Sequence, residues 1–316
     1  MRLSRPFFQM PLLFDVERLQ AEVGALPNEA WVAHPDQVPG NSAVRLITSG
    51  GGENDGVQGR MAPTPWLEAM PYLKQALAGF GVVWSRSRLM RLAPGAGVPE
   101  HADINYHWHT RVRLHIPIFT WPEVRFHCDG EAVHMGEGEA WVFDNWRRHH
   151  VENNASQARV HLVADTTGTA AFWRFVHAPA PPRGQWREVG WDPKANHPLL
   201  TEINQRSPIM SAAEVQWLLD DLKGELALTV DSPETRQRAG RFVQLLDGFA
   251  LDWRQLCALH GLDGVAVEEF QRLGMAVRAS ATPLAEGLVM RTNGASALLV
   301  LEKRVLGHLV AEDAAR

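Results

Sequence analysis

Residues 101–118, HADINYHWHTRVRLHIPI, gather side chains that could bind a metal ion: four histidines, one aspartate and two arginines. His101 and Asp103 are two positions apart, so in an extended segment both side chains point to the same side of the chain. An imidazole and a carboxylate directed at one point are typical metal ligands. Without a third ligand, this pair is equally typical of a surface loop with a local hydrogen bond.

A third ligand is available in residues 143–165, where His149 and His150 precede another apolar, strand-like run. Two histidines and one carboxylate on one face of an ion leave three coordination positions open, an arrangement that suits non-haem Fe(II) binding a cosubstrate together with O2. By residue type alone, either histidine can complete the set.

Arg159 lies ten positions after His149, at the start of the apolar run VHLVA. A guanidinium buried at the start of a strand needs an anionic partner. Its planar fork fits a carboxylate through two parallel hydrogen bonds. The distal carboxylate of 2-oxoglutarate would be such a partner.

Several motifs together resemble the aspartyl/asparaginyl β-hydroxylases, a branch of the Fe(II)/2-oxoglutarate oxygenases with a double-stranded β-helix core. The similarity runs over about residues 40–175, and its carriers are RLAPGAGVPEHAD, RVRLHIPI, GEAWVFD, HHVENNASQARVHLVAD and TAAFW. In this family the distal histidine is followed by any residue and then valine, with an arginine ten positions on. That register selects His149, since Val151 and Arg159 then both fit, whereas His150 would place the arginine nine positions away.

The resemblance implies an enzyme that hydroxylates an amino acid, free or within a peptide, with O2 as a further substrate. Fe(II) would bind His101, Asp103 and His149, which would be the catalytic centre, and 2-oxoglutarate would be anchored by Arg159. Arg113 and His115 match positions that help to hold the 2-oxoglutarate carboxylates.

One feature departs from the animal members of the family, which lack the acidic metal ligand that Asp103 supplies here. In this respect the chain is closer to the bacterial members that hydroxylate free proline or other amino acids, which also carry a helical C-terminal part. Specificity for aspartate or asparagine is therefore not implied.

The elements that must position these residues follow from the hydrophobic pattern. Near-alternating apolar residues predict strands at 84–92, 111–118, 123–128, 139–144 and 158–165. Helical spacing predicts helices over 15–26 and 64–80, and again from Ser211 and from Ser232 onward. We therefore expect a mainly β fold with flanking helices. A double-stranded β-helix (jelly-roll or cupin-like) core would occupy residues 1–178, and a smaller, mainly helical domain residues 179–316.

Composition excludes several classes of protein. The net charge of −5 and the pI of about 6.3 argue against a nucleic-acid partner. The two cysteines are far apart and form no CxxC pair, which argues against a disulfide scaffold or a zinc finger. The start of the chain resembles no signal peptide, and no apolar run reaches the roughly 18 residues of a membrane span. A cytoplasmic protein without a membrane partner is expected.

Other interpretations remain open. A cupin-type metal enzyme without 2-oxoglutarate would use the same ligands, and Arg159 counts against it. A non-enzymatic metal-binding interaction module is a further alternative. Arg113 could instead be a structural arginine paired within the sheet, and His107 and His109 are expected to face solvent. The helical part could serve as a dimer interface for a homodimer, as a lid or as a docking surface.

Overall fold

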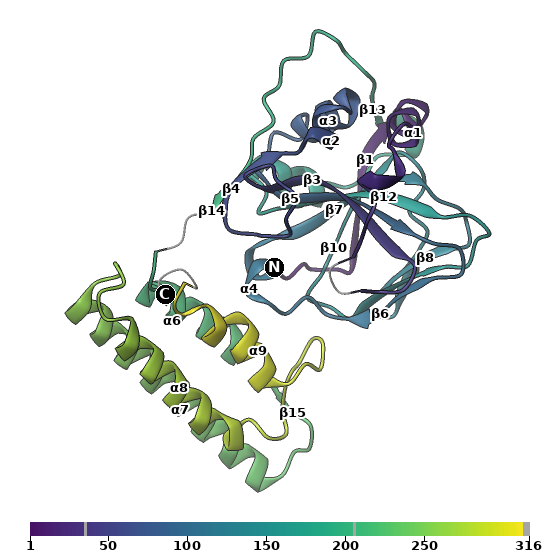
Figure 1. Cartoon of the computed structure of the whole chain (residues 1–316). Helices are drawn as coiled ribbons and strands as arrows, with labels where there is room; N and C mark the ends of the chain where they lie inside the picture. The colour runs from purple at the N-terminus through teal and green to yellow at the C-terminus, as the bar shows by residue number, and fades with distance from the viewer. Residues whose placement is uncertain (35–36, 205–206, 312–316) are drawn as a thin grey trace. The chain divides into compact units, whose positions relative to one another are not determined.

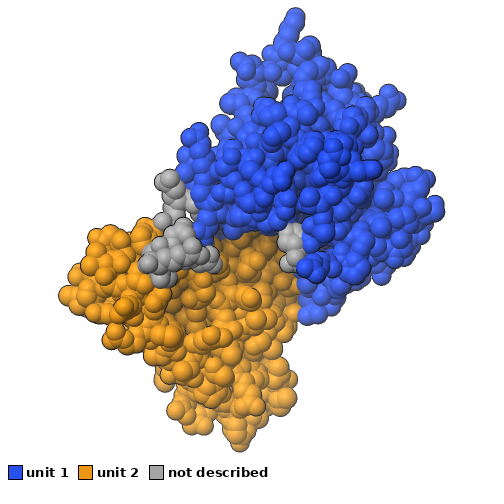
Figure 2. Space-filling view, in the orientation of Figure 1, with its two compact units in different colours: residues 1–101, 110–205 blue, residues 102–109, 206–316 orange. Residues whose placement is uncertain are grey.

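The computed structural model describes residues 1–34, 37–204 and 207–311 of the chain. By its internal contacts the chain divides into two compact units (Figure 2). Residues 1–101 and 110–205 form the first, called here the β unit. Residues 102–109 and 206–316 form the second, called the helical unit. The short segment 102–109, which contains Asp103, thus packs with residues that follow it by a hundred positions or more.

The β unit is built on a ten-stranded major sheet, antiparallel except where β1 meets β13. In pairing order its strands are β13 (Arg187–Val189), β1 (Phe7–Phe14), β10 (Glu139–Phe143), β7 (Val112–Phe119), β12 (Arg159–Thr166), β5 (Trp84–Leu92), β3 (Asn41–Ser49), β4 (Gly59–Pro63) and β14 (Ile203–Asn204), with β2 (Val32–Ala33) beside β3. The five predicted strands are present, each within a residue or so of the expected bounds.

β1 is among the strands that were not predicted from the sequence. It pairs in register with β10 and lies next to the edge strand β13 of the major sheet, although its sequence FFQMPLLF contains Gln9 and Pro11. Pro11 falls where the register shifts between Met10 and Leu13. A proline cannot donate to a ladder and is tolerated in a sheet at such an irregularity. The proline that interrupts the apolar pattern, and so made this strand hard to predict, therefore lies at a β-bulge or a similar shift in register.

Alternation along β7 and β12 gives the major sheet one apolar and one polar face. Leu114, Ile116, Leu162 and Ala164 are fully buried on the first face, in the main core. Helices pack over that face and contribute Leu19, Leu73 and Phe172 to the same core (Figure 1). They are α1 (Val16–Gly24), α2 (Pro65–Glu68), α3 (Pro71–Ala78) and α5 (Ala170–His177). Each large aliphatic side chain buried in this way stabilises the folded state by about 1.5–3 kcal/mol. The packing of the helices therefore fixes the orientation of the sheet, whose polar face is turned away from them.

A four-stranded minor sheet faces the polar side of the major sheet. Its order is β6 (Gly97–His101), β11 (His149–Asn153), β8 (Val124–Cys128) and β9 (Glu131–Val133). Phe126 and Val151 of the minor sheet pack with Leu92, Trp141 and Phe143 of the major sheet in a second, smaller core. Two antiparallel sheets that pack face to face confirm the expected double-stranded β-helix class of fold.

The helical unit contains α6 (Ala212–Gly224), α7 (Pro233–His260), α8 (Val267–Leu284) and α9 (Ala297–Arg304), with β15 (Leu226–Leu228) paired to β16 (Leu288–Met290). Ser211 accepts a hydrogen bond from the backbone of Glu214, and Ser232 forms a capping box with Thr235, at the predicted helix starts. The predicted helical C-terminal region is thus confirmed. No helix within the described ranges is both long and apolar enough to span a bilayer.

A short helix, α4 (Tyr106–Thr110), brings the segment 102–109 into the helical unit. Arg304, only 3% exposed, donates to the carboxylate of Asp221 at 2.9 Å and to the backbone carbonyl of Ile104 at 3.4 Å. His107 and His109 are buried here, so the expectation that they face solvent is wrong. The residue types of a short polar segment do not show that a helix far along the chain packs over it.

Candidate metal centre

His101, Asp103 and His149 come together at one end of the minor sheet. Each offers one ligand atom, and these atoms all lie within 4.8 Å of one another. His101 is the last residue of β6 and His149 the first of β11, and the two stand opposite one another in the antiparallel register. Asp103 follows His101 by two positions. Strand pairing therefore brings one histidine to the other, and the chain beyond β6 brings the carboxylate.

Backbone carbonyls orient both imidazoles. Nδ1 of His101 lies 2.8 Å from the carbonyl oxygen of Pro99, and Nδ1 of His149 lies 2.9 Å from that of Arg147. A carbonyl only accepts, so each Nδ1 carries the proton and each Nε2 keeps the lone pair that a metal ion needs. This is the usual way in which a ligating histidine is held. The donor set of two neutral imidazoles and one carboxylate fits Fe(II).

Arg159, at the start of β12, is the most unusual charge in the β unit. It is 4% exposed, and burial lowers the pKa of its guanidinium to about 9, so it stays charged at neutral pH. Its Nη2 lies 2.7 Å from Nδ1 of His161, while its Nε has no hydrogen-bond partner among the described residues. No carboxylate of the described residues forms an ion pair with it. A buried cation in this state lacks a counter-ion.

His115 and His161 continue the same polar face. Their Nδ1 atoms lie 3.4 Å apart, and neither Nε2 has a partner within the described part of the chain. Burial, and secondarily the charge of Arg159, holds the pKa of both imidazoles well below the ordinary value, so both are neutral. Since Arg159 donates to Nδ1 of His161, the proton of that ring lies on Nε2, which becomes a buried donor.

Aromatic rings connect this polar group to the metal cluster. The ring of Phe143 lies 4.8 Å from that of His149 and 5.5 Å from that of His115, and the rings of His115 and His161 lie 5.7 Å apart. Buried polar atoms without partners are rare and call for an explanation. Here three of them, on Arg159, His115 and His161, follow one another away from the metal cluster. A small anion bound beside Arg159 could accept from the guanidinium Nε and from the Nε2–H of His161.

Arg113 was predicted to bind the cosubstrate together with His115. Its guanidinium forms two hydrogen bonds with the carboxylate of Asp165, at 2.8 and 3.2 Å. Both residues lie on the polar face of the major sheet, opposite one another in register. The cosubstrate roles of Arg113 and His115 remain predictions.

His161 is a functional candidate that reasoning from the sequence did not single out. The available signal was its position two residues after Arg159, which places both on the same face of β12. His150, by contrast, lies outside the metal cluster, and its ring stacks on that of His127.

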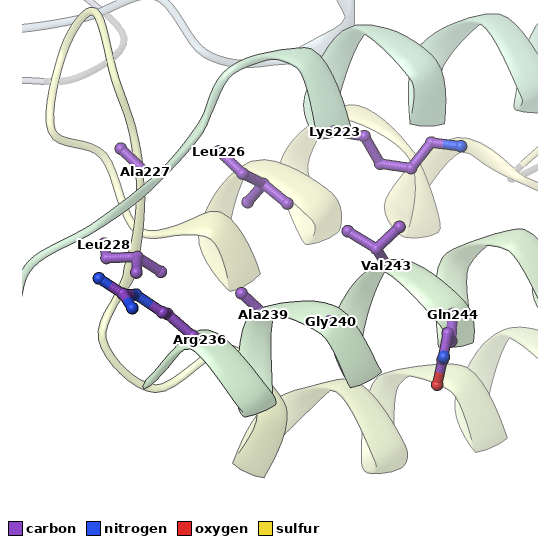
Figure 3. Close-up of a pocket in the computed structure, with 9 residues that line it drawn as sticks. All are labelled: Lys223, Leu226, Ala227, Leu228, Arg236, Ala239, Gly240, Val243 and Gln244. Carbon is purple, nitrogen blue, oxygen red and sulfur yellow. The ribbon is translucent and has the colours of Figure 1, made fainter. Parts of the chain in front are cut away.

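The helical unit has a pocket of its own, shown in Figure 3. Leu226, Leu228 and Val243 supply much of its apolar lining, and Lys223 and Arg236 its charges. No histidine, cysteine or carboxylate is among the residues that line it, so these residues offer no typical metal ligand.

The segment that carries the metal cluster matches a known protein family. Residues 58–168 match the family model described as aspartyl/asparaginyl beta-hydroxylase. The chain is therefore similar to that family over about a third of its length. The matched residues include the three clustered ligands and Arg159, and they run from just before β4 to just after β12.

Solved structures give weaker likenesses. An oxidoreductase of the 2OG-Fe(II) oxygenase family from Burkholderia pseudomallei is 17% identical, with 48% of this chain and 77% of that chain covered and a TM-score of 0.35. A Pseudomonas putida prolyl-4-hydroxylase is 16% identical, with 53% and 95% covered and a TM-score of 0.34. A predicted oxalate decarboxylase from Thermotoga maritima is 15% identical, with 43% and 89% covered and a TM-score of 0.26. Scores this low carry no weight for function. No curated protein matches this chain.

Proposed function

We propose that this protein is an Fe(II)- and 2-oxoglutarate-dependent dioxygenase that hydroxylates an amino acid, free or within a peptide. The observation that carries the proposal is Arg159, a buried guanidinium without an acidic partner among the described residues. The distal carboxylate of 2-oxoglutarate would supply the missing charge and could accept from the unpaired Nε. The family match supports the same conclusion.

His101, Asp103 and His149 would hold the ion, each through the atom that it contributes to the cluster. When bound, Fe(II) and 2-oxoglutarate supply the oxidising chemistry: O2 is consumed, 2-oxoglutarate becomes succinate and CO2, and a C–H bond of the substrate becomes C–OH. The carbonyls of Pro99 and Arg147 keep both imidazoles in the tautomer that can bind metal.

The polar face of the major sheet would bind and orient the cosubstrate. Arg159 would take its distal carboxylate, and the neutral His161 would hold the guanidinium in place through the 2.7 Å contact. His115 and Arg113 would assist from β7, as their positions in the family motif imply. Phe126 and Phe143, both buried, would keep water away from this pocket.

The test is a succinate-release assay with Fe(II), 2-oxoglutarate and O2 across a panel of free amino acids and peptides. Arg159→Ala and a reaction without amino-acid substrate serve as controls. We expect substrate-stimulated succinate release by the wild type and a stoichiometric hydroxylated product. Turnover of a substrate that is independent of 2-oxoglutarate would favour a cupin-type metal enzyme instead. If the protein binds metal but turns over no member of the panel, the result would favour a non-enzymatic metal-binding interaction module.

A further inference from the structure

A second cluster of ligand-type side chains lies on the other face of the minor sheet. His127 of β8 and His150 of β11 stand opposite one another in the register, and their rings stack 4.1 Å apart with an interplanar angle of 6°. Glu152, two positions after His150, shares its face of β11. One ligand atom from each of the three residues lies within 4.8 Å of the others.

The spacing within this cluster is too wide for hydrogen bonds. Nε2 of His127 lies 3.6 Å from one carboxylate oxygen of Glu152, and Nε2 of His150 lies 4.0 Å from the other. A contact between nitrogen and oxygen of 3.6 Å or more is not a hydrogen bond. An ion that binds each atom at about 2.0–2.2 Å with tetrahedral angles places its ligand atoms roughly 3.3–3.6 Å apart. The distance between His127 and Glu152 falls in that range, and the distance between His150 and Glu152 exceeds it, so a small movement of the His150 side chain would complete the site.

The exposure of these three side chains, and their few other contacts, would also allow an ion to bind. The side chains of His127 and His150 are each 30% exposed and that of Glu152 is 48% exposed, so an ion can reach them from solvent. Nε2 of His127 has no hydrogen-bond partner within the described ranges. The one further contact of the Glu152 carboxylate given by the structure is a long one from the amide of Asn154, at 3.5 Å.

We propose that His127, His150 and Glu152 form a second metal site, separate from the His101 cluster, that takes a borderline divalent ion such as Zn2+. Two imidazoles and one carboxylate are a common donor set for Zn2+, and water would complete its coordination. Two of the three ligands are placed by direct strand pairing. Because the lone pair of an imidazole lies in the ring plane, one of the two stacked rings would have to rotate about its side-chain bonds for both to bind one ion. An ion there would bridge β8 and β11 and so stabilise the strand that begins at His149.

The ion would bind only the folded chain, and bound ligand raises the thermal midpoint. The rival interpretation is a stacked histidine pair that only covers the sheet. Under that interpretation Zn2+ would not distinguish these residues from other exposed histidines.

The experiment is a Zn2+ titration of the purified full chain against a chromophoric chelator, which reports both stoichiometry and affinity. It is run on the wild type, His127→Ala, His150→Ala and Glu152→Gln, with His197→Ala as the control for an exposed histidine elsewhere in the β unit. Loss of an outer-shell partner already costs about 10–100-fold in metal affinity, so loss of either imidazole ligand should cost at least as much. We expect His127→Ala and His150→Ala each to lose one equivalent of Zn2+ and its thermal stabilisation. His197→Ala should bind as the wild type does.

The same titration in a His149→Ala background isolates the outer site, because that substitution removes a ligand of the inner cluster. One equivalent should remain, and His150→Ala should abolish it. If Zn2+ binding is unchanged in both His127→Ala and His150→Ala, the second site does not exist. If the wild type binds a single equivalent that His150→Ala removes, the second site stands and the inner cluster fails instead.

Discussion

His101 and His149 stand opposite one another on neighbouring antiparallel strands, with ring centroids 4.2 Å apart. Each is oriented by the carbonyl of the residue two positions before it. The pairing of β6 with β11 thus determines the spacing of two of the three metal ligands.

His101→Ala should abolish Fe(II) binding and leave the fold intact. Its side chain is exposed and belongs to neither core of the β unit, so little packing is lost. Anaerobic titration calorimetry with Fe(II), together with a thermal melt, measures both effects. Retention of wild-type Fe(II) affinity by a folded His101→Ala protein would show that the ion binds elsewhere.

His149→Ala and His150→Ala should differ in the complex that they form with Fe(II) and 2-oxoglutarate. Adjacent residues of a strand point to opposite faces, so only His149 can join His101 and Asp103. The visible charge-transfer band of the anaerobic Fe(II)–2-oxoglutarate complex should be absent in His149→Ala and present in His150→Ala. The reverse result would exchange the two histidines.

Arg159→Ala should raise the apparent 2-oxoglutarate constant by roughly 30-fold or more and change Fe(II) affinity less. Removal of one partner from a desolvated charge pair costs about 2–5 kcal/mol, and each 1.4 kcal/mol is about tenfold. Arg159→Lys should recover only part of this, because an ammonium keeps the charge and loses the planar fork. Anaerobic titration of 2-oxoglutarate into the Fe(II)-loaded variants gives the constants. Unchanged affinity in Arg159→Ala would move the anchor to another residue, with Arg113 the next candidate.

Arg304→Met should destabilise the helical unit by about 3–5 kcal/mol, because it removes a buried guanidinium that forms an ion pair with the partly buried carboxylate of Asp221. Arg304 also donates to the carbonyl of Ile104, the residue after Asp103, so Fe(II) affinity should fall by about 10–100-fold. Urea unfolding and an Fe(II) titration measure the two effects.

Arg278→Met is the matched control for Arg304→Met, since it removes an exposed ion pair with Glu302 in the same unit. Exposed pairs contribute only about 0–1 kcal/mol, so this variant should resemble the wild type in both measurements. If the two variants are equivalent, Arg304 does not hold the segment 102–109.

Local pattern in the sequence was enough for most elements of the fold. The alternating run RVRLHIPI identified β7 and its two faces, and Ser211 and Ser232 identified two helix starts, because alternation and capping involve residues close along the chain. The spacing of His101 and Asp103 predicted a metal site for the same reason. The helical spacing of residues 64–80 likewise predicted the region that contains α2 and α3.

Tertiary structure alone decided what depends on residues far apart in the chain. Pairing of β6, β11 and β8 sends His149 to the metal cluster and His150 to the opposite face, against His127. Burial of His107 depends on contacts of α4 with residues that follow it by a hundred positions or more. The carboxylate that pairs with Arg113 lies on another strand, at Asp165. A local pattern records the period of an element, whereas the partner across a sheet or between helices is selected by the packing of the whole unit.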